Sequence, residues 1–116
     1  MTDYDLYAVE ASSLEDAEVL VAGILSLEFA ANDWSNEGPH LSAMDQGDEV
    51  FTLRENIVPS TGMPVEPRHF QHRFLLYIAE TDRGEELRQA LSAESRVRLL
   101  RHEIIGPYPP IQTVRV

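Results

Sequence analysis

Histidines and carboxylates are the side chains of this sequence that could perform chemistry, because it contains no cysteine. Two histidines stand close together in the segment His-Phe-Gln-His at 69–72, and only Glu55 and His40 could join them around a metal ion. A zinc site needs three or four ligands that converge with defined spacings, usually with a supporting set of hydrogen bonds. The two histidines follow a proline-rich segment, where presentation on one face of a helix is not expected. We therefore predict no metal site and no bound cofactor.

Catalytic side chains form no recognisable constellation either. No serine stands in a Gly-x-Ser-x-Gly elbow, no glycine-rich phosphate loop is present, and the lack of cysteine excludes thiolate chemistry. Carboxylates are so abundant that no acid–base pair is specific. Glu10 and Glu80 end two similar apolar segments and could form a symmetric pair, but helix capping or solvent exposure explains them as well. We predict no catalytic residue.

The charge distribution is the most informative bulk property. The net charge is −11, and there is no lysine. Residues 1–50 hold twelve Asp and Glu without any Arg, whereas residues 51–116 hold eight acidic residues and nine Arg. Such a negative field repels phosphate backbones and anionic lipids, so we expect neither nucleic acid nor a membrane as partner. The short basic and aromatic run at 69–74 is weak evidence against this. A basic protein partner is favoured, with a merely solvated acidic surface as the alternative.

Trp34 is the only tryptophan and stands in a polar segment that is rich in carboxylates. A tryptophan packed in the core is the default, but an exposed one surrounded by acids would suit an interface hot spot for a basic protein. The residues expected to bind such a partner are Asp33, Trp34, Glu37, Asp45, Asp48 and Glu49.

Two segments seventy residues apart share one pattern, and they organise the predicted fold. Residues 6–10 match residues 76–80 without a gap, and each apolar run ends at a glutamate. Ser12 and Asp82 then stand where a side chain caps a helix, each with a glutamate three residues on. Apolar residues recur at helical spacing after both. The pattern predicts a pseudo-repeat of strand, capped turn and amphipathic helix.

The end of the first helix is open to two interpretations. Gly23 stands where a helix commonly ends in a left-handed residue. Leu25, Leu27 and Phe29 then alternate with less apolar residues, which is the period of a half-buried strand. We favour a strand after Gly23, and a helix that continues to Phe29 is the alternative.

The remaining elements follow from alternation and turn chemistry. We expect strands at 4–10, 40–45, 49–58, 74–80, 97–105 and 111–116, a second helix at 85–92, a hairpin turn at 46–48 and a surface loop at 59–67. The order is β-α-β-β-β and then β-α-β-(β). This predicts an α+β fold in which two strand–helix pseudo-repeats pack on one mixed or antiparallel sheet. With no interdomain linker, residues 1–116 are expected to form a single domain.

The predicted location is the cytoplasm. The first residues are acidic and lack the apolar region of a secretory signal. The longest apolar run, Val19–Leu25, is far shorter than the roughly 20 residues of a membrane span.

The segment order, with a helix ending before Gly-Ile in Val-Ala-Gly-Ile-Leu-Ser-Leu-Glu, resembles one module of the vicinal-oxygen-chelate (glyoxalase-like) fold. That resemblance implies metal ligands on the opening and closing strands of each module. Tyr4–Val9 contains no histidine, and only Glu55 and His72 fall near such positions. The resemblance implies a small-molecule-binding protein or enzyme with a site between the two halves.

The general run of the chain resembles small acidic immunity proteins of bacterial polymorphic-toxin systems. The similar stretches are Tyr-Asp-Leu-Tyr-Ala-Val, Ser-Leu-Glu-Asp-Ala, Glu55-Asn56 at a strand end, and Leu-Leu-Tyr-Ile-Ala-Glu-Thr-Asp-Arg. This resemblance implies a stoichiometric inhibitor of a cognate toxin. We therefore expect a non-catalytic acidic protein that inhibits a basic toxin domain; the alternative is a small-molecule-binding protein or enzyme of glyoxalase-like fold. A homodimer is compatible with the sequence.

Overall fold

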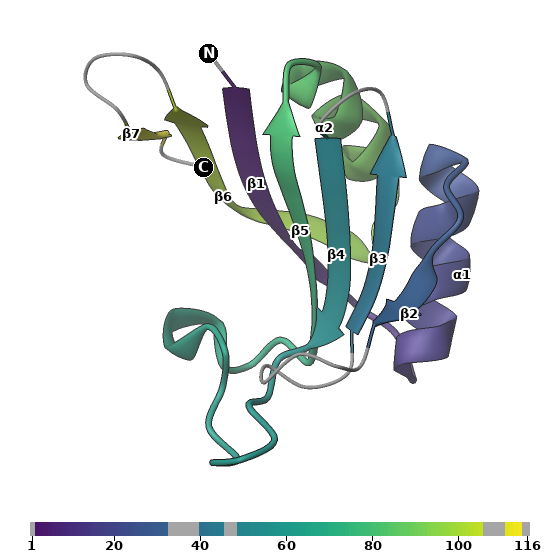
Figure 1. Ribbon diagram of the computed structural model, residues 1–116, viewed down its shortest axis with the longest axis vertical. Helices are drawn as coiled ribbons and strands as arrows, with labels where there is room; N and C mark the ends of the chain where they lie inside the picture. Colours follow the sequence, from purple (N-terminus) through teal and green to yellow (C-terminus); the bar gives the residue numbers. More distant parts are fainter. Residues whose placement is uncertain (1, 33–39, 46–48, 106–110, 115–116) are drawn as a thin grey trace.

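The computed structural model describes residues 2–32, 40–45, 49–105 and 111–114. All seven strands found there belong to one antiparallel sheet of order β2-β3-β4-β5-β1-β6-β7 (Figure 1). The strands are β1 (Thr2–Val9), β2 (Ala30–Asn32), β3 (His40–Asp45), β4 (Glu49–Glu55), β5 (Phe74–Thr81), β6 (Val97–Ile105) and β7 (Ile111–Val114). The helices are α1 (Leu14–Leu25), α2 (Gly84–Ser92) and the short 3-10 helix η1 (Pro67–His69). The predicted α+β class with one sheet is confirmed, and the pseudo-repeat stays a prediction.

The sheet order interlocks the two halves of the chain. β5 lies between β1 and β4, and β1 lies between β5 and β6. The units β1-α1-β4 and β5-α2-β6 are therefore both split by a strand of the other, which is the split β-α-β arrangement of ferredoxin-like folds. The pair β2–β3 is inserted before β4, and β7 extends the sheet beyond β6.

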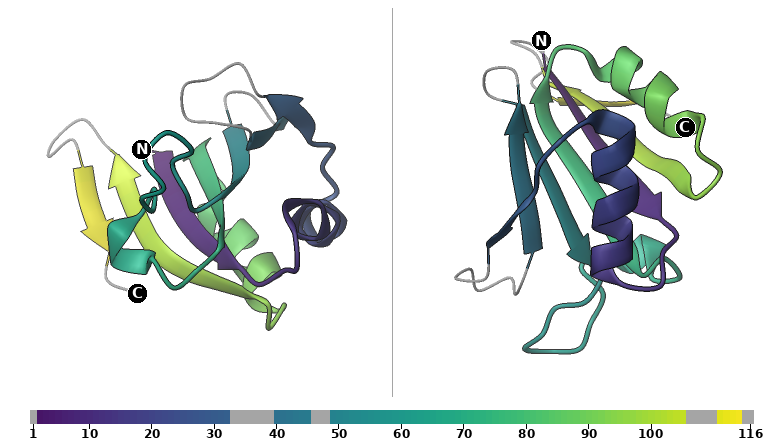
Figure 2. Two further views of the ribbon diagram at one scale, coloured as in Figure 1. Left: turned by 90° about the horizontal axis from the view of Figure 1, so that it is seen from below. Right: turned by 90° about the vertical axis from the view of Figure 1, so that its right-hand side faces the viewer.

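Both long helices cover the same face of the sheet (Figure 2). Ala17 and Val21 of α1 and Leu87 and Leu91 of α2 are buried against it. The strands contribute the other side of this core, chiefly Tyr7, Val9, Phe51, Leu53, Phe74, Leu76 and Ile78. None of the helices in the described part of the chain is long and apolar enough to cross a membrane.

The boundaries predicted for the first helix were wrong at both ends. Ser13, not Ser12, is the N-cap, and its side chain accepts a hydrogen bond from the Asp16 amide at 3.0 Å. Gly23 lies inside α1, which ends when Ser26 adopts a left-handed conformation with φ of 55°. The helix continues because Ile24 and Leu25 extend its apolar stripe onto the core.

The strand expected directly after Gly23 is also absent from the described residues. Leu27 and Phe29 belong to the segment that joins α1 to β2, and both pack against the core from there. The alternating apolar residues after Gly23 are therefore buried, but they do not form a β-strand. Likewise, α2 lacks the predicted side-chain cap at Asp82: Arg83 is the N-cap residue and makes no capping bond through its side chain.

Two bulges in the central strands decide which side chains share a face. The pairing of β1 with β5 shifts between Asp5–Ile78 and Asp3–Thr81, next to Glu80, whose φ is 58°. The pairing of β1 with β6 shifts by one extra residue, Leu100. Each extra residue reverses the alternation of side chains beyond it.

The face of the sheet opposite the helices is partly covered by the segment from Ile57 to Arg73, which contains η1. Asn56 organises this segment, because its side-chain amide donates to the carbonyls of His69 and His72 at 2.9 and 3.0 Å. Its side-chain oxygen accepts from the amide of Glu66 at 2.9 Å. The proline-rich loop predicted at 59–67 is confirmed, but the strand before it was predicted too long, since β4 ends at Glu55 and residues 56–58 belong to the loop. One buried side chain fixes the loop's conformation.

Candidate functional site

The acidic surface predicted around Trp34 lies mostly outside the described residues. Asp33, Trp34, Glu37 and Asp48 belong to segments that the structure does not describe, and so does the side chain of Asp45. The backbone of Asp45 ends β3 and pairs with Glu49 across the β3–β4 hairpin. The hairpin predicted here is confirmed.

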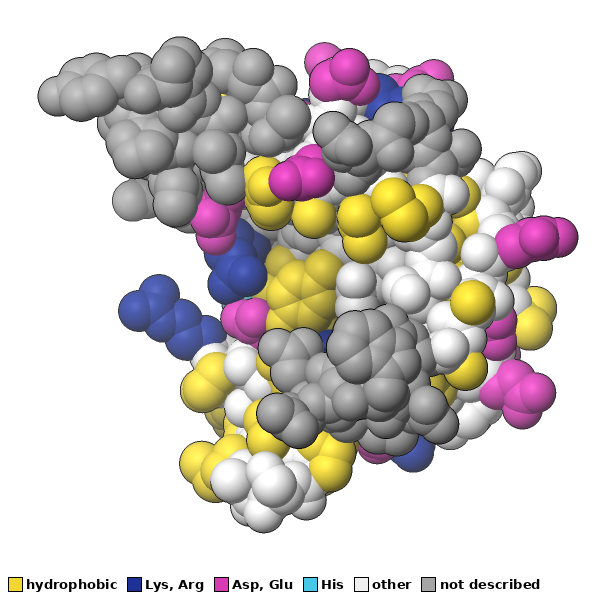
Figure 3. Space-filling view, viewed as in Figure 1, with side chains coloured by type: hydrophobic (Ala, Val, Ile, Leu, Met, Phe, Trp, Pro, Cys, Tyr) yellow, Lys and Arg dark blue, Asp and Glu magenta, His cyan; other side chains and the backbone are white. Residues whose placement is uncertain are grey.

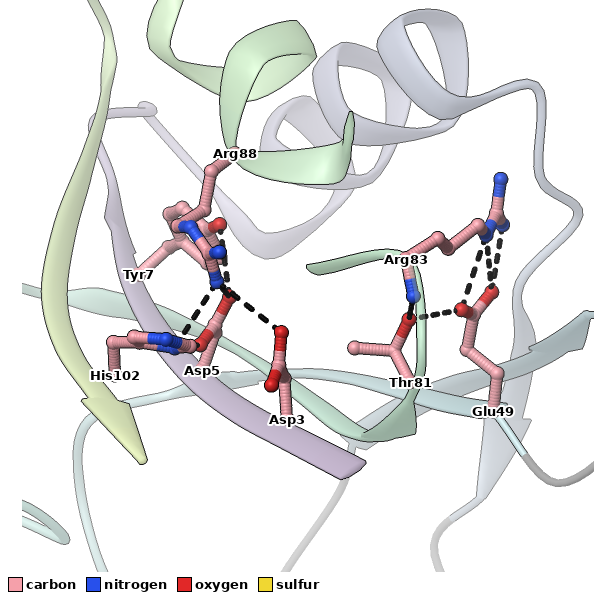
Figure 4. Close-up of polar contacts among 8 residues, drawn as sticks. All are labelled: Asp3, Asp5, Tyr7, Glu49, Thr81, Arg83, Arg88 and His102. Carbon is pink, nitrogen blue, oxygen red and sulfur yellow. Dashed lines mark hydrogen bonds and ion pairs between the residues drawn. The ribbon is translucent and has the colours of Figure 1, made fainter. Parts of the chain in front are cut away.

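Glu49 is not a surface residue, contrary to the prediction. Its exposed fraction is 1%, and Arg83 binds its carboxylate with Nε at 3.1 and 3.2 Å and Nη2 at 2.6 Å (Figure 4). The hydroxyl of Thr81 donates to the same carboxylate. Thr81 lies three residues after Ile78, whose side chain faces the helices. In a regular strand these two side chains would point to opposite faces, so the bulge beside Glu80 is what turns Thr81 toward the helices and the Glu49 carboxylate. The carboxylate of Glu49 is therefore occupied inside the protein and is not available to a partner.

A second buried charge cluster surrounds Asp5 beneath α2. Arg88 Nη1 lies 3.0 Å from one oxygen of the fully buried Asp5 carboxylate, and the His102 ring contacts the other oxygen (Figure 4). The hydroxyl of Tyr7 donates to Asp5 at 3.4 Å. Burial, and then the negative charge of Asp5, raises the pKa of Tyr7 far above its usual value, so this hydroxyl stays protonated.

The Asp5–His102 pair has the geometry that orients a histidine for acid–base chemistry. However, His102 is only 7% exposed, which restricts access of a substrate to its ring. Arg88 also donates to the carboxylate, so the pair forms a closed charge cluster. A structural role fits this cluster best. Within the described residues, no group of three metal-ligating side chains is close enough to hold a metal ion.

Arginines of the second half neutralise several acids of the first half. Arg83 pairs with Glu49, Arg88 with Asp5, and Arg96 with Asp16 at 2.9 Å. In the folded protein the first half of the chain therefore carries fewer unpaired negative charges than its sequence indicates. The acids of α1 and its flanks for which the structure shows no ion pair are Glu10, Glu15, Glu18 and Glu28.

The face of the sheet opposite α1 and α2 carries a hollow of about 320 Å³ that is lined by Thr52, Arg54, Val65 and Tyr77. Figure 3 looks onto this face and shows hydrophobic side chains at its centre with acidic and basic ones beside them. Glu66 of the loop bridges two strands there, since it accepts from the Tyr77 hydroxyl at 2.6 Å and from Arg101 at 3.1 Å. The hollow is mixed in polarity, because Thr52 and Arg54 share its lining with Val65 and Tyr77.

The predicted metal-ligand candidates are spread over different elements. His40 begins β3, Glu55 ends β4 and pairs with Arg73 at 3.2 Å, and His69 and His72 lie in the loop with ring centroids 6.4 Å apart. Sequence reasoning missed Asn56 as an organising residue, although an asparagine between a strand and a proline-rich segment is a recognisable turn signal.

No protein-family model matches this sequence, and the comparison with curated proteins finds no significant match. The site must therefore be interpreted from its own geometry and charge.

Proposed function

We propose that this protein is a non-catalytic acidic binding protein, an immunity-type inhibitor of a basic toxin domain. Two features support the proposal. The buried carboxylates, Glu49 and Asp5, are enclosed in ion-pair clusters, and the outer surface of α1 carries acids that no arginine of the described residues neutralises.

The surface of α1 is the observation that carries the proposal. Its solvent-facing side chains include Glu15 and Glu18, and no Arg or Lys occurs anywhere in residues 1–50. Val19 is 70% exposed on the same helix. An exposed apolar side chain among unpaired carboxylates is the composition expected where a basic surface docks, because charge steers the encounter and apolar contact slows dissociation.

The proposed partner-binding surface consists of Glu15, Glu18, Val19 and Glu28 together with Asp33, Trp34, Glu37, Asp45 and Asp48 from the sequence prediction. Glu49 is removed from it because its carboxylate is buried. Attraction between surfaces of opposite charge raises association rates above the ~10⁵–10⁶ M⁻¹s⁻¹ of neutral pairs and is screened by salt.

The test measures association of the purified protein with the product of the neighbouring gene, which this proposal expects to contain a basic toxin domain, as a function of salt. Replacing Glu15, Glu18 and Glu28 by Gln should slow association about 3- to 10-fold at low salt. The matched control replaces Asp82, Glu85 and Glu86, which are exposed just before and within the first turn of α2 and carry the same charge; of these, Glu86 lies 3.9 Å from Arg83.

The Trp34→Ala variant should mainly speed dissociation. Salt-independent association, or an equal effect of the two triple variants, would contradict this location of the interface. Absence of binding to the neighbouring gene product would contradict the proposed function itself.

A further inference from the structure

Two arginines differ from the others in having no partner within the described residues. Six of the arginines described have their guanidinium groups engaged by carboxylates or backbone carbonyls: Arg54, Arg73, Arg83, Arg88, Arg96 and Arg101. Arg68 and Arg98 make no hydrogen bond or ion pair with any residue that the structure describes. Acidic residues outnumber arginines 20 to 9, so a shortage of carboxylates does not explain why these two guanidinium groups have no partner among the described residues.

Both unpaired arginines line the same hollow of about 370 Å³. The loop contributes Arg68, His69, Gln71 and His72, and β6 contributes the segment from Arg98 to Leu100. None of these lining residues is acidic. Four groups that carry or can gain positive charge therefore converge in a protein whose net charge is −11.

The fold builds this hollow from two features already described. Arg98 pairs with Ala8 and Arg101 pairs with Leu6, and both β1 residues face away from the helices. Side chains three residues apart in a regular strand point to opposite faces, so the extra residue Leu100 is what brings Arg98 and Arg101 to the same face. Arg98 itself reaches this face by regular alternation, between the core residues Val97 and Leu99, and the extra residue Leu100 lines the hollow beside it.

Asn56 fixes the other wall of the hollow. The two carbonyls that its side chain holds belong to His69 and His72, the residues whose side chains line the hollow. Asn56 is only 9% exposed, so its hydrogen bonds are shielded from competing water. The backbone that carries both imidazoles is thus fixed before any ligand arrives, which lowers the entropic cost of binding.

The charges around His72 oppose one another. Desolvation, then His69 and Arg98, lower the pKa of His72, and Glu10 acts weakly in the opposite direction. Arg68 lines the same hollow, and Arg73 borders the neighbouring one that His72 also lines. An anion in the hollow would relieve this repulsion and favour the protonated imidazole.

We propose that the hollow between the loop and β6 binds a small molecule through an oxyanion group, a phosphate or a carboxylate, held by Arg68 and Arg98 with His69 and His72 as further donors. Guanidinium groups bind both oxyanions through paired hydrogen bonds. The volume of about 370 Å³ is in the range of small-molecule sites. A nucleic acid strand would bring many phosphates toward a strongly acidic protein, so a small ligand is the better match.

The test is a titration followed by NMR of the amide and histidine ring signals, at constant ionic strength, with inorganic phosphate, pyrophosphate and citrate as probes. Saturable shifts at His69, His72 and Arg98 are expected, and the ranking of the probes identifies phosphate or carboxylate as the preferred group.

The Arg98→Gln variant should weaken binding about tenfold or more, and Arg68→Gln should also weaken it. The matched control is Arg73→Gln, which removes the same charge from an exposed residue already paired with Glu55. Equal losses in Arg98→Gln and Arg73→Gln would overturn the proposal, as would shifts that chloride reproduces. Tighter binding of a single-stranded oligonucleotide than of any small probe would assign the hollow to nucleic acid instead.

Discussion

Replacing Asn56 by alanine tests whether one side chain holds the loop on the sheet. The substitution removes three hydrogen bonds to the backbone groups of Glu66, His69 and His72. Each such bond contributes about 0.5–1.5 kcal/mol net, which gives about 3 kcal/mol in total. The freed carbonyls belong to half-buried residues that water can partly reach, so we expect a loss of about 2 kcal/mol. For a chain of this size the melting temperature should fall by about 8 °C.

The measurement is urea unfolding together with hydrogen exchange of the Glu66 amide, which donates to Asn56. Exchange at this amide reports local opening of the loop even when the rest of the protein stays folded. Gln71→Ala is the matched control on the same loop, because Gln71 is exposed and makes no hydrogen bond among the described residues. A loss below about 0.5 kcal/mol in Asn56→Ala, with unchanged exchange at Glu66, would refute the reasoning.

The Asn56→Asp variant separates the hydrogen bonds from the shape of the side chain. Its carboxylate can still accept from Glu66, but the other oxygen then faces the carbonyls of His69 and His72. This repulsion raises the pKa of the new carboxyl group in the folded state above its unfolded value of about 3.9. The protein is then destabilised above the raised pKa, and the loss disappears as the pH falls below about 4. Unfolding at several pH values measures this.

Three further predictions follow from the buried charges and the helices. Glu49→Ala should destabilise the protein by about 3 kcal/mol in urea unfolding, because it leaves Arg83 without its buried partner, whereas a substitution on an exposed acidic surface would cost less than about 0.5 kcal/mol. Gly23→Ala should stabilise the protein by about 0.5–1 kcal/mol in thermal melts, because Gly23 lies inside α1 with no atom near a new Cβ; a loss would mean that the helix does end there. Burial raises the pKa of Tyr7 and of Tyr77, so their contribution to stability is complete below about pH 10 and is lost as the pH rises further. The measurement is tyrosinate absorbance of the folded protein near pH 10.5, and ionisation of these two tyrosines to the same extent as free tyrosine would contradict the prediction.

The parts of the fold that depend on local sequence could be predicted. β6 has the predicted bounds of 97–105, and the β3–β4 hairpin was identified from two alternating runs separated by a turn. These elements follow from periodicity and turn residues, which act over a few positions. The first helix was predicted too short, because a glycine in a helix and a glycine that ends one look alike without the packing of the residues beyond it.

The candidate site depends on long-range pairing, which the sequence does not show. Glu49 was placed on an acidic surface because it follows Asp45 and Asp48 in a carboxylate-rich stretch, whereas its partner Arg83 lies 34 residues away. The two bulges have a similar consequence. Regular alternation cannot place Thr81 on the face of Glu49 or Arg101 on the same face as Arg98, since each arrangement requires one extra residue in a strand.

The position of β1 has a consequence for the order in which the protein can fold during synthesis. This first strand pairs only with β5 and β6, which begin at Phe74 and Val97. A ribosome releases the apolar residues of β1 long before either neighbour exists, although the β3–β4 hairpin can already form. The nascent chain must therefore keep Leu6 to Val9 unpaired until β5 and β6 have emerged. Chaperones that bind short apolar segments would meet this protein at β1, and the centre of the sheet would close only after β5 and β6 have been synthesised.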